Sequence, residues 1–159
     1  MGTGPIIIGY DGSPSSKRAI DEAGALLSRH RVLVAVVWEA GLGSALVDVP
    51  EIPPAPIDVR AALEIDKTLY DRARRLAQQG AQLAEKAGLE AEPLVVADVV
   101  TVAETLVRLA KERDAQAIAI GTDGIGLTDV LLGGTTRGVI QHASCPVVVV
   151  REPKKRSRT

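Results

Sequence analysis

The chain has 159 residues, of which 46% are hydrophobic and 25% charged, and its formal net charge is −1. This size and balance fit one globular domain with a single substantial core, and they exclude a disordered chain. The near-neutral charge gives no overall attraction to nucleic acid, and an aromatic content of 2% leaves few stacking platforms for single strands, so we do not expect a nucleic-acid partner.

The first predicted strand is the apolar run at residues 6–8, which stops at Gly9 and is typical of a strand buried on both faces. Ser13 and Pro14 suit the N-cap and first position of a helix, which we expect to end near His30. A second buried strand is predicted at residues 32–38.

Residues 39–57 are rich in glycine and proline and show no periodicity, so they predict a long irregular loop. Such a loop either lies over a ligand or only connects two elements. A long helix is predicted from Asp58 to about Ala87, and Gly88 closes it.

The second half repeats the alternation of strand and helix. A third strand is predicted at residues 94–96, and Thr101 with Glu104 has the spacing of a capping box that opens the next helix. The fourth strand is predicted at residues 117–120. A glycine-rich run, a short helix and a fifth strand at residues 147–150 follow.

This order predicts an α/β fold with an open, mostly parallel five-stranded sheet and helices on both faces. Ligands of such sheets bind at the carboxyl ends of the strands, so we expect a site after strands one, two and four. Residues 1–152 are interpreted as a single domain, and the basic residues 153–159 as a disordered tail.

The glycine-rich run from Gly121 to Gly134 leaves a strand and leads into a helix. Glycines allow close approach of a ligand, and the start of a helix offers free amides that favour phosphate. Thr135 and Thr136 add hydroxyl donors there. The same residues also suit a plain strand end and helix cap, so an anion site and a purely structural turn both stay open.

Three separated motifs resemble the universal stress protein family. Gly121, Gly124, Gly134 and Thr135 follow the Gly-x2-Gly-x9-Gly-Ser/Thr pattern of its nucleotide-binding members. The segments at residues 8–13 and 142–150 resemble its first and last strands. The resemblance implies a Rossmann-like fold related to adenine nucleotide hydrolases, and ATP as a ligand with Mg²⁺ carried by its phosphates.

Residue by residue, the resemblance implies two groups of contacts. The nucleoside side comprises Gly9, Asp11, Val37, Ile120 and Gly121, and the phosphate side comprises Gly124, Gly134, Thr135 and Thr136. The motif can also be aligned with a spacer of eight residues. Gly133 is then its third glycine, Gly134 takes the place of the hydroxyl residue, and Thr136 matches a later Ser/Thr of the family. Asp11 has the alternative role of capping the first helix.

The resemblance implies a nucleotide-dependent interaction module of the stress response, with slow hydrolysis at most because no catalytic pair is present. The alternative is a dimeric family member that binds no nucleotide. We expect a homodimer through residues 147–150, an unknown protein partner, and no metal site built by the protein.

The single cysteine, Cys145, excludes an intrachain disulfide and fits a reducing compartment. The sequence has no apolar run of the roughly 18 residues that a membrane span requires, and no basic start followed by an apolar stretch. We therefore expect a cytoplasmic protein without membrane contact.

Overall fold

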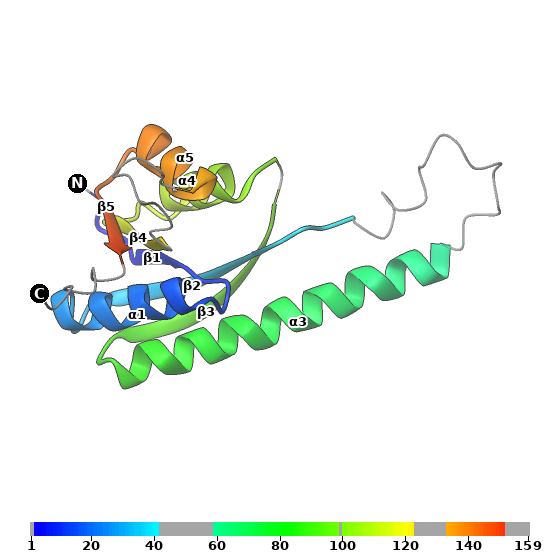
Figure 1. Ribbon diagram of the computed structural model, residues 1–159, viewed down its shortest axis with the longest axis horizontal. Helices are drawn as coiled ribbons and strands as arrows, with labels where there is room; N and C mark the ends of the chain where they lie inside the picture. The colour runs from blue at the N-terminus through cyan, green and yellow to red at the C-terminus, as the bar shows by residue number, and fades with distance from the viewer. Residues whose placement is uncertain (1, 42–58, 99, 123–132, 152–159) are drawn as a thin grey trace, which may run out of the picture.

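The computed structural model describes residues 2–41, 59–98, 100–122 and 133–151 (Figure 1). Its elements, in chain order, are β1 (Ile6–Gly9), α1 (Pro14–Leu26), β2 (Arg31–Trp38), α3 (Val59–Lys86), β3 (Glu90–Ala97), α4 (Val102–Glu112), β4 (Ala117–Thr122), α5 (Gly134–His142) and β5 (Val147–Arg151). Most of the predicted loop at residues 39–57 and the predicted tail at 153–159 lie outside the described residues.

The five strands form one sheet in the order β3-β2-β1-β4-β5, and every neighbouring pair is parallel. Ile7 of β1 pairs with Leu33 of β2 on one side and with Ile118 of β4 on the other. The predicted open, parallel α/β sheet is therefore confirmed. The first strand of the chain occupies the centre of the sheet.

Alternate residues of each strand face opposite sides, and each side is covered by its own pair of helices. Ile6, Ile8 and Val34 belong to a cluster packed against α1 and α3. Ile7, Leu33 and Ile118 belong to a second cluster packed against α4 and α5. Figure 1 shows the resulting three layers, with the sheet between the two helix pairs.

Two predicted boundaries were wrong. The first helix ends at Leu26 instead of near His30, because Arg29 adopts a positive φ of 67° and turns the chain into β2. The third strand begins at Glu90 instead of residue 94. Its first half carries Glu90, Glu92 and Pro93, which hide the strand in the sequence and are tolerated because β3 is an edge strand.

Helix α3 has 28 residues, and its N-terminal part runs past the end of the sheet (Figure 1). Tyr70 contacts Trp38 of β2 edge to face, with ring centroids 5.6 Å apart. The C-terminal end of α3 is followed by Gly88, where φ is 91°. The Leu89 amide donates to the Ala84 carbonyl there and so closes the helix. No helix in the described part of the chain is long and apolar enough to cross a membrane.

A candidate nucleotide pocket at the carboxyl ends of the strands

The sheet changes direction at β1. The chain moves from β1 outward to β2 and β3, and then returns to the other side of β1 for β4 and β5. The connections after β1 and β4 therefore diverge to opposite faces and leave an opening at the carboxyl ends of these strands. The structure has its candidate pocket at this opening.

The pocket has a volume of about 200 Å³ and is lined by residues of six elements or their connections. Its lining combines apolar side chains with hydroxyl groups and a single carboxylate. The lining residues are Gly9, Tyr10, Asp11, Ser13, Ser15, Ser16, Ala35, Val37, Val102, Leu106, Ile120, Gly121, Thr135 and Thr136. Ligand sites typically measure roughly 300–1,000 Å³, so these residues enclose only part of a nucleotide-sized ligand.

The turn between β1 and α1 is held by a network of hydrogen bonds around Asp11. The Ser13 amide donates to Asp11 Oδ1 at 2.9 Å, and the Ser16 amide donates to Ser13 Oγ at 3.2 Å. Ser13 is thus the N-cap of α1, as predicted, while Asp11 fixes the turn that precedes it. The alternative in which Asp11 itself caps the helix does not hold.

The Asp11 carboxylate is kept ionised at the mouth of the pocket. Burial opposes ionisation, but hydrogen bonds from Ser13 and Ser16 outweigh it and hold the pKa of Asp11 below its usual value. A carboxylate in this state is an acceptor for an amino or hydroxyl group of a ligand.

Helix α5 begins at the opposite side of the pocket. Gly133 is its N-cap and has no side chain to bond the first amides, so the amides of Gly134, Thr135 and Thr136 have no partner within the helix. Thr135 and the buried Thr136 both line the pocket. The two registers of the glycine motif therefore place the same two hydroxyl groups beside the cavity.

The structure brings most of the predicted site residues together. Those that line the pocket are Gly9, Asp11, Val37, Ile120, Gly121, Thr135 and Thr136. Gly133 and Gly134 adjoin them at the start of α5, and Gly124 lies outside the described residues.

Several lining residues were missed by sequence reasoning. Ser15 and Ser16 follow the predicted N-cap, and their hydroxyls near a strand end were a readable signal. Val102 and Leu106 of α4 also line the pocket, and neither is among the predicted site residues. Their position over the pocket depends on the order of the strands, which the sequence does not encode locally.

The described residues offer little for metal or acid–base chemistry. Within residues 2–41, 59–98, 100–122 and 133–151, no group of three or more His, Cys, Asp or Glu side chains is placed to hold a metal ion. Cys145 is away from the pocket and half-buried, and burial raises the pKa of its thiol. The pocket is suited to binding a ligand through hydroxyls, amides and one carboxylate.

Fold and pocket together define an open parallel α/β protein with a ligand pocket at its topological switch point. Comparison of the sequence with known families narrows this class. The model of the universal stress protein family matches residues 2–151, and the chain belongs to that family. It is 30% identical over 152 residues to the universal stress protein MJ0531 of Methanocaldococcus jannaschii, covering 94% of this chain and 83% of that one.

Solved structures share the fold. A universal stress protein from Archaeoglobus fulgidus is 24% identical, has a TM-score of 0.68, and is matched over 92% of this chain and 98% of its own. A universal stress protein in complex with cAMP has a TM-score of 0.62 and 20% identity, with 95% and 98% of the two chains covered. One from Arabidopsis thaliana with AMP bound has a TM-score of 0.61 and 15% identity, with 98% and 96% covered.

Proposed function

We propose that this chain binds an adenine nucleotide in the pocket and serves as a nucleotide-dependent interaction module of the stress response. The observation that carries the proposal is that one pocket combines apolar side chains with two polar groups, Asp11 before α1 and the hydroxyls of Thr135 and Thr136 at the start of α5. Ala35, Val37, Leu106 and Ile120 supply apolar surface for a base. ATP, with Mg²⁺ on its phosphates, is the member of this ligand class that the sequence motif favours.

The two polar ends of the pocket suit different parts of such a ligand. The ionised Asp11 accepts hydrogen bonds, which fits the amino group of adenine or a ribose hydroxyl. The unpaired amides at the start of α5 and the hydroxyls of Thr135 and Thr136 donate hydrogen bonds, which fits a phosphate. Complexes of family members with cAMP and AMP support this assignment.

Any hydrolysis of a bound nucleotide would be slow. Enzymes that transfer phosphoryl groups place cationic side chains or metal ions where charge develops, and a base or polar group that orients the attacking water. Among the pocket residues that the structure describes, none is Lys, Arg or His. We therefore propose a binding module in place of an efficient ATPase.

We also propose a homodimer through the β5 edge. The two edges of the sheet differ, because β3 carries Glu90, Glu92 and Pro93, which are typical guards against strand pairing. In β5, residues Val147 to Val150 carry neither a charge nor a proline. Pairing of β5 with a second copy would cover that edge. We further propose that the protein acts in the cytoplasm and that it interacts there with another protein, whose identity is unknown.

The test is to purify the protein, denature it, identify any released nucleotide, and measure binding of adenine nucleotides by calorimetry. We expect binding, and we expect Gly134→Val to abolish it, because under this proposal the added side chain would obstruct the phosphate at the start of α5. A Cβ on Gly134 meets no protein atom within 4 Å, so the fold should be undisturbed. Ile140→Val, an exposed position of the same helix, is the matched control.

The absence of released nucleotide, together with no calorimetric binding, would refute the nucleotide proposal. The protein would then act as a dimeric interaction protein without a nucleotide, which is the alternative reading. Wild-type affinity in Gly134→Val would refute the placement of the phosphate at α5.

A further inference from the structure

A second groove lies between α1 and α3, outside the nucleotide pocket. It has a volume of about 250 Å³ and is lined by residues of the β1–α1 turn and of both helices. The turn separates the two sites, because Asp11 and Ser13 line the pocket whereas Gly12 lines the groove. None of the residues proposed to bind the nucleotide lines this α1–α3 groove.

Close contacts at two points fix α1 and α3 relative to each other. A Cβ on Gly12, where φ is 79°, would lie 2.9 Å from Leu76 Cδ1, so the turn rests directly on α3. A Cβ on Gly24 would collide with the Ala87 carbonyl, so the end of α1 also touches the end of α3. The lining residues of α3 lie between these contacts, from Leu76 to Lys86. The α1–α3 groove is therefore preformed by packing.

The floor of the groove is apolar. Leu76 and Leu83 are half-buried, and Tyr10, only 5% exposed, packs beneath Gly80 of α3. The Tyr10 hydroxyl has no hydrogen-bond partner among the described residues. A ligand in the groove would therefore meet apolar side chains and one free hydroxyl group.

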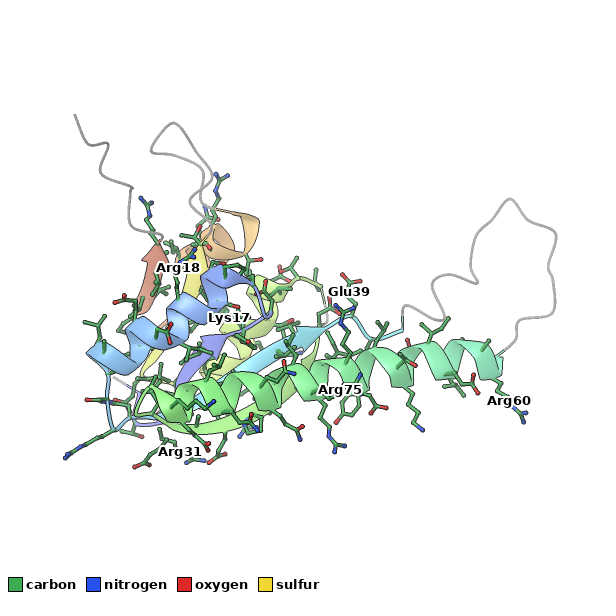
Figure 2. All side chains as sticks on the ribbon, turned by 60° about the horizontal axis from the view of Figure 1, so that its bottom comes forward. Lys17, Arg18, Arg31, Glu39, Arg60 and Arg75 are labelled. Atoms are coloured by element: carbon green, nitrogen blue, oxygen red, sulfur yellow. The ribbon has the colours of Figure 1, made fainter. Side chains whose placement is uncertain are left out.

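The rim of the groove is positively charged. Lys17 of α1 and Lys86 of α3 line it, and Figure 2 shows Lys17 on the side of α1 that faces α3. In the part of the chain that the structure describes, no carboxylate lies within 4 Å of either ammonium group. Asp21 and Glu85, the carboxylates closest to these lysines in the sequence, are not among the lining residues.

Amide side chains and further cations extend this face along α3. Gln79 and Gln82 line the groove, and neither side chain makes a hydrogen bond to another described residue. Arg75 and Arg72 precede Gln79 by four and seven residues, so they lie on the same face of the helix. The face offers amides to a peptide backbone and positive charge to carboxylates.

The dimensions of the groove favour an extended peptide over a small anion. From Leu76 to Lys86 the helix rises by about 15 Å, at 1.5 Å per residue. An extended chain covers that length with about four or five residues. A nucleic acid is less suited, because the one aromatic ring of the groove, Tyr10, is buried and offers no stacking surface.

From this shape and charge we infer that the α1–α3 groove binds an acidic segment of a partner protein, with carboxylates at the two lysines and an apolar side chain on the floor. The inference rests on the proposed role as an interaction module and deepens it, because it gives the partner a docking place and a chemistry. The partner then lies against the β1–α1 turn, whose Asp11 lines the nucleotide pocket.

The probe is the acetylated and amidated peptide Glu-Asp-Leu-Glu-Asp, titrated into the ¹⁵N-labelled full chain and followed by NMR. About 0.15 M salt screens charges more than about 8 Å apart, so that binding reports local contacts. We expect the largest shifts at the amides of Gly12, Gln79 and Leu83. The uncharged peptide Gln-Asn-Leu-Gln-Asn should bind about five-fold more weakly or less.

Two double variants that lose the same charge separate the groove from the net charge of the protein. Lys17→Gln with Lys86→Gln should weaken binding of the acidic peptide about five-fold or more, because both charge pairs are lost. Lys67→Gln with Lys111→Gln removes two exposed lysines that do not line the groove. This control should keep the affinity within about two-fold of the wild type.

No binding of the acidic peptide, or equal weakening in the two double variants, would overturn the inference. An oligothymidine strand that binds more tightly than the peptide, and loses its affinity only in the groove variant, would assign the groove to nucleic acid and also overturn it. Calorimetry with adenine nucleotides tests the proposed function separately. If the peptide binds in the groove and no nucleotide binds, the docking site stands and the nucleotide dependence fails.

Discussion

A Cβ atom on Gly121 would collide with the backbone carbonyl oxygen of Ser15. The end of β4 and the first turn of α1 therefore approach so closely that only glycine fits between them. Gly121 belongs to the motif expected to bind nucleotide, yet packing between two elements already requires it. Gly133 and Gly134 differ, since a Cβ on either meets nothing within 4 Å.

These two kinds of glycine predict opposite results for the same substitution. Gly121→Ala should destabilise the fold by about 2 kcal/mol or more, because the backbone of α1 must move. That corresponds to a fall in Tm of about 4 °C or more for a chain of this size. Gly134→Ala should leave Tm nearly unchanged. Thermal unfolding followed by circular dichroism measures both, and equal melting curves for the two variants would contradict the close approach.

Ser13→Ala should weaken the first turn of α1. Ser13 Oγ accepts from the Ser16 amide and lies 3.0 Å from Ser15 Oγ, so its loss leaves the helix start uncapped beside the pocket. We expect a cost of about 1 kcal/mol in the free energy of unfolding, measured by urea titration. Ser28→Ala, at an exposed position after the same helix, is the control and should cost almost nothing.

The pKa of Asp11 predicts how stability depends on acidity. Because the folded-state pKa lies below the unfolded value, the ionised Asp11 contributes stability above the unfolded pKa. This contribution is lost as the pH falls through the folded pKa. Urea unfolding between pH 6 and pH 3 should therefore show a shallower decline of the free energy of unfolding in Asp11→Asn than in the wild type.

Asp21→Asn, an exposed carboxylate on the outer side of α1, provides the comparison. If Asp11→Asn follows the wild-type pH curve, the hydrogen bonds of the turn do not favour the ionised carboxylate.

Gln116→Ala should loosen the N-terminal segment. Gln116 Nε2 donates to the Gly4 carbonyl at 2.8 Å, while the Gly4 amide donates to the Asp114 carbonyl at 2.8 Å. We expect a loss of about 1 kcal/mol and faster hydrogen exchange at the Gly4 amide. Gln141→Ala on the exposed side of α5 is the control. Unchanged exchange at Gly4 would show that the side chain does not hold the segment.

Val149→Pro should convert the proposed dimer to a monomer. The Ile118 amide donates to the Pro146 carbonyl at 2.9 Å, and parallel strands bond a neighbour through alternate residues. The Val149 amide therefore points to the open edge, and proline removes it while sparing the bonds to β4. Light scattering after size exclusion gives the mass. A dimer that persists in this variant would place the interface elsewhere.

The sequence was informative where strands are buried on both faces and helices have clear caps. The apolar runs around Ile7, Val34 and Ile118 correctly predicted the three central strands. Ser13 and Thr101 were correctly predicted as N-caps. The start of β3 could not be predicted, because β3 is an edge strand. Its exposed first half tolerates Glu90 and Pro93, which do not look like a strand in the sequence.

Other features depend on contacts between distant segments. The need for glycine at residue 121 comes from Ser15, more than a hundred residues earlier, and Gln116 has a role only because the N-terminal segment packs beside it. Leu106 reaches the pocket because α4 covers the same face as α5. Such contacts depend on the order of the strands in the sheet, and no local sequence pattern predicts them.

The central place of β1 affects the chain while it is being synthesised. Ile6 pairs with Ala117, so one side of the first strand stays unpaired until most of the protein has left the ribosome. At roughly 5–20 residues per second this takes on the order of ten seconds. Nascent chains that stall before residue 117 expose the Ile6-Ile7-Ile8 edge, a surface suited to capture by chaperones or to aggregation.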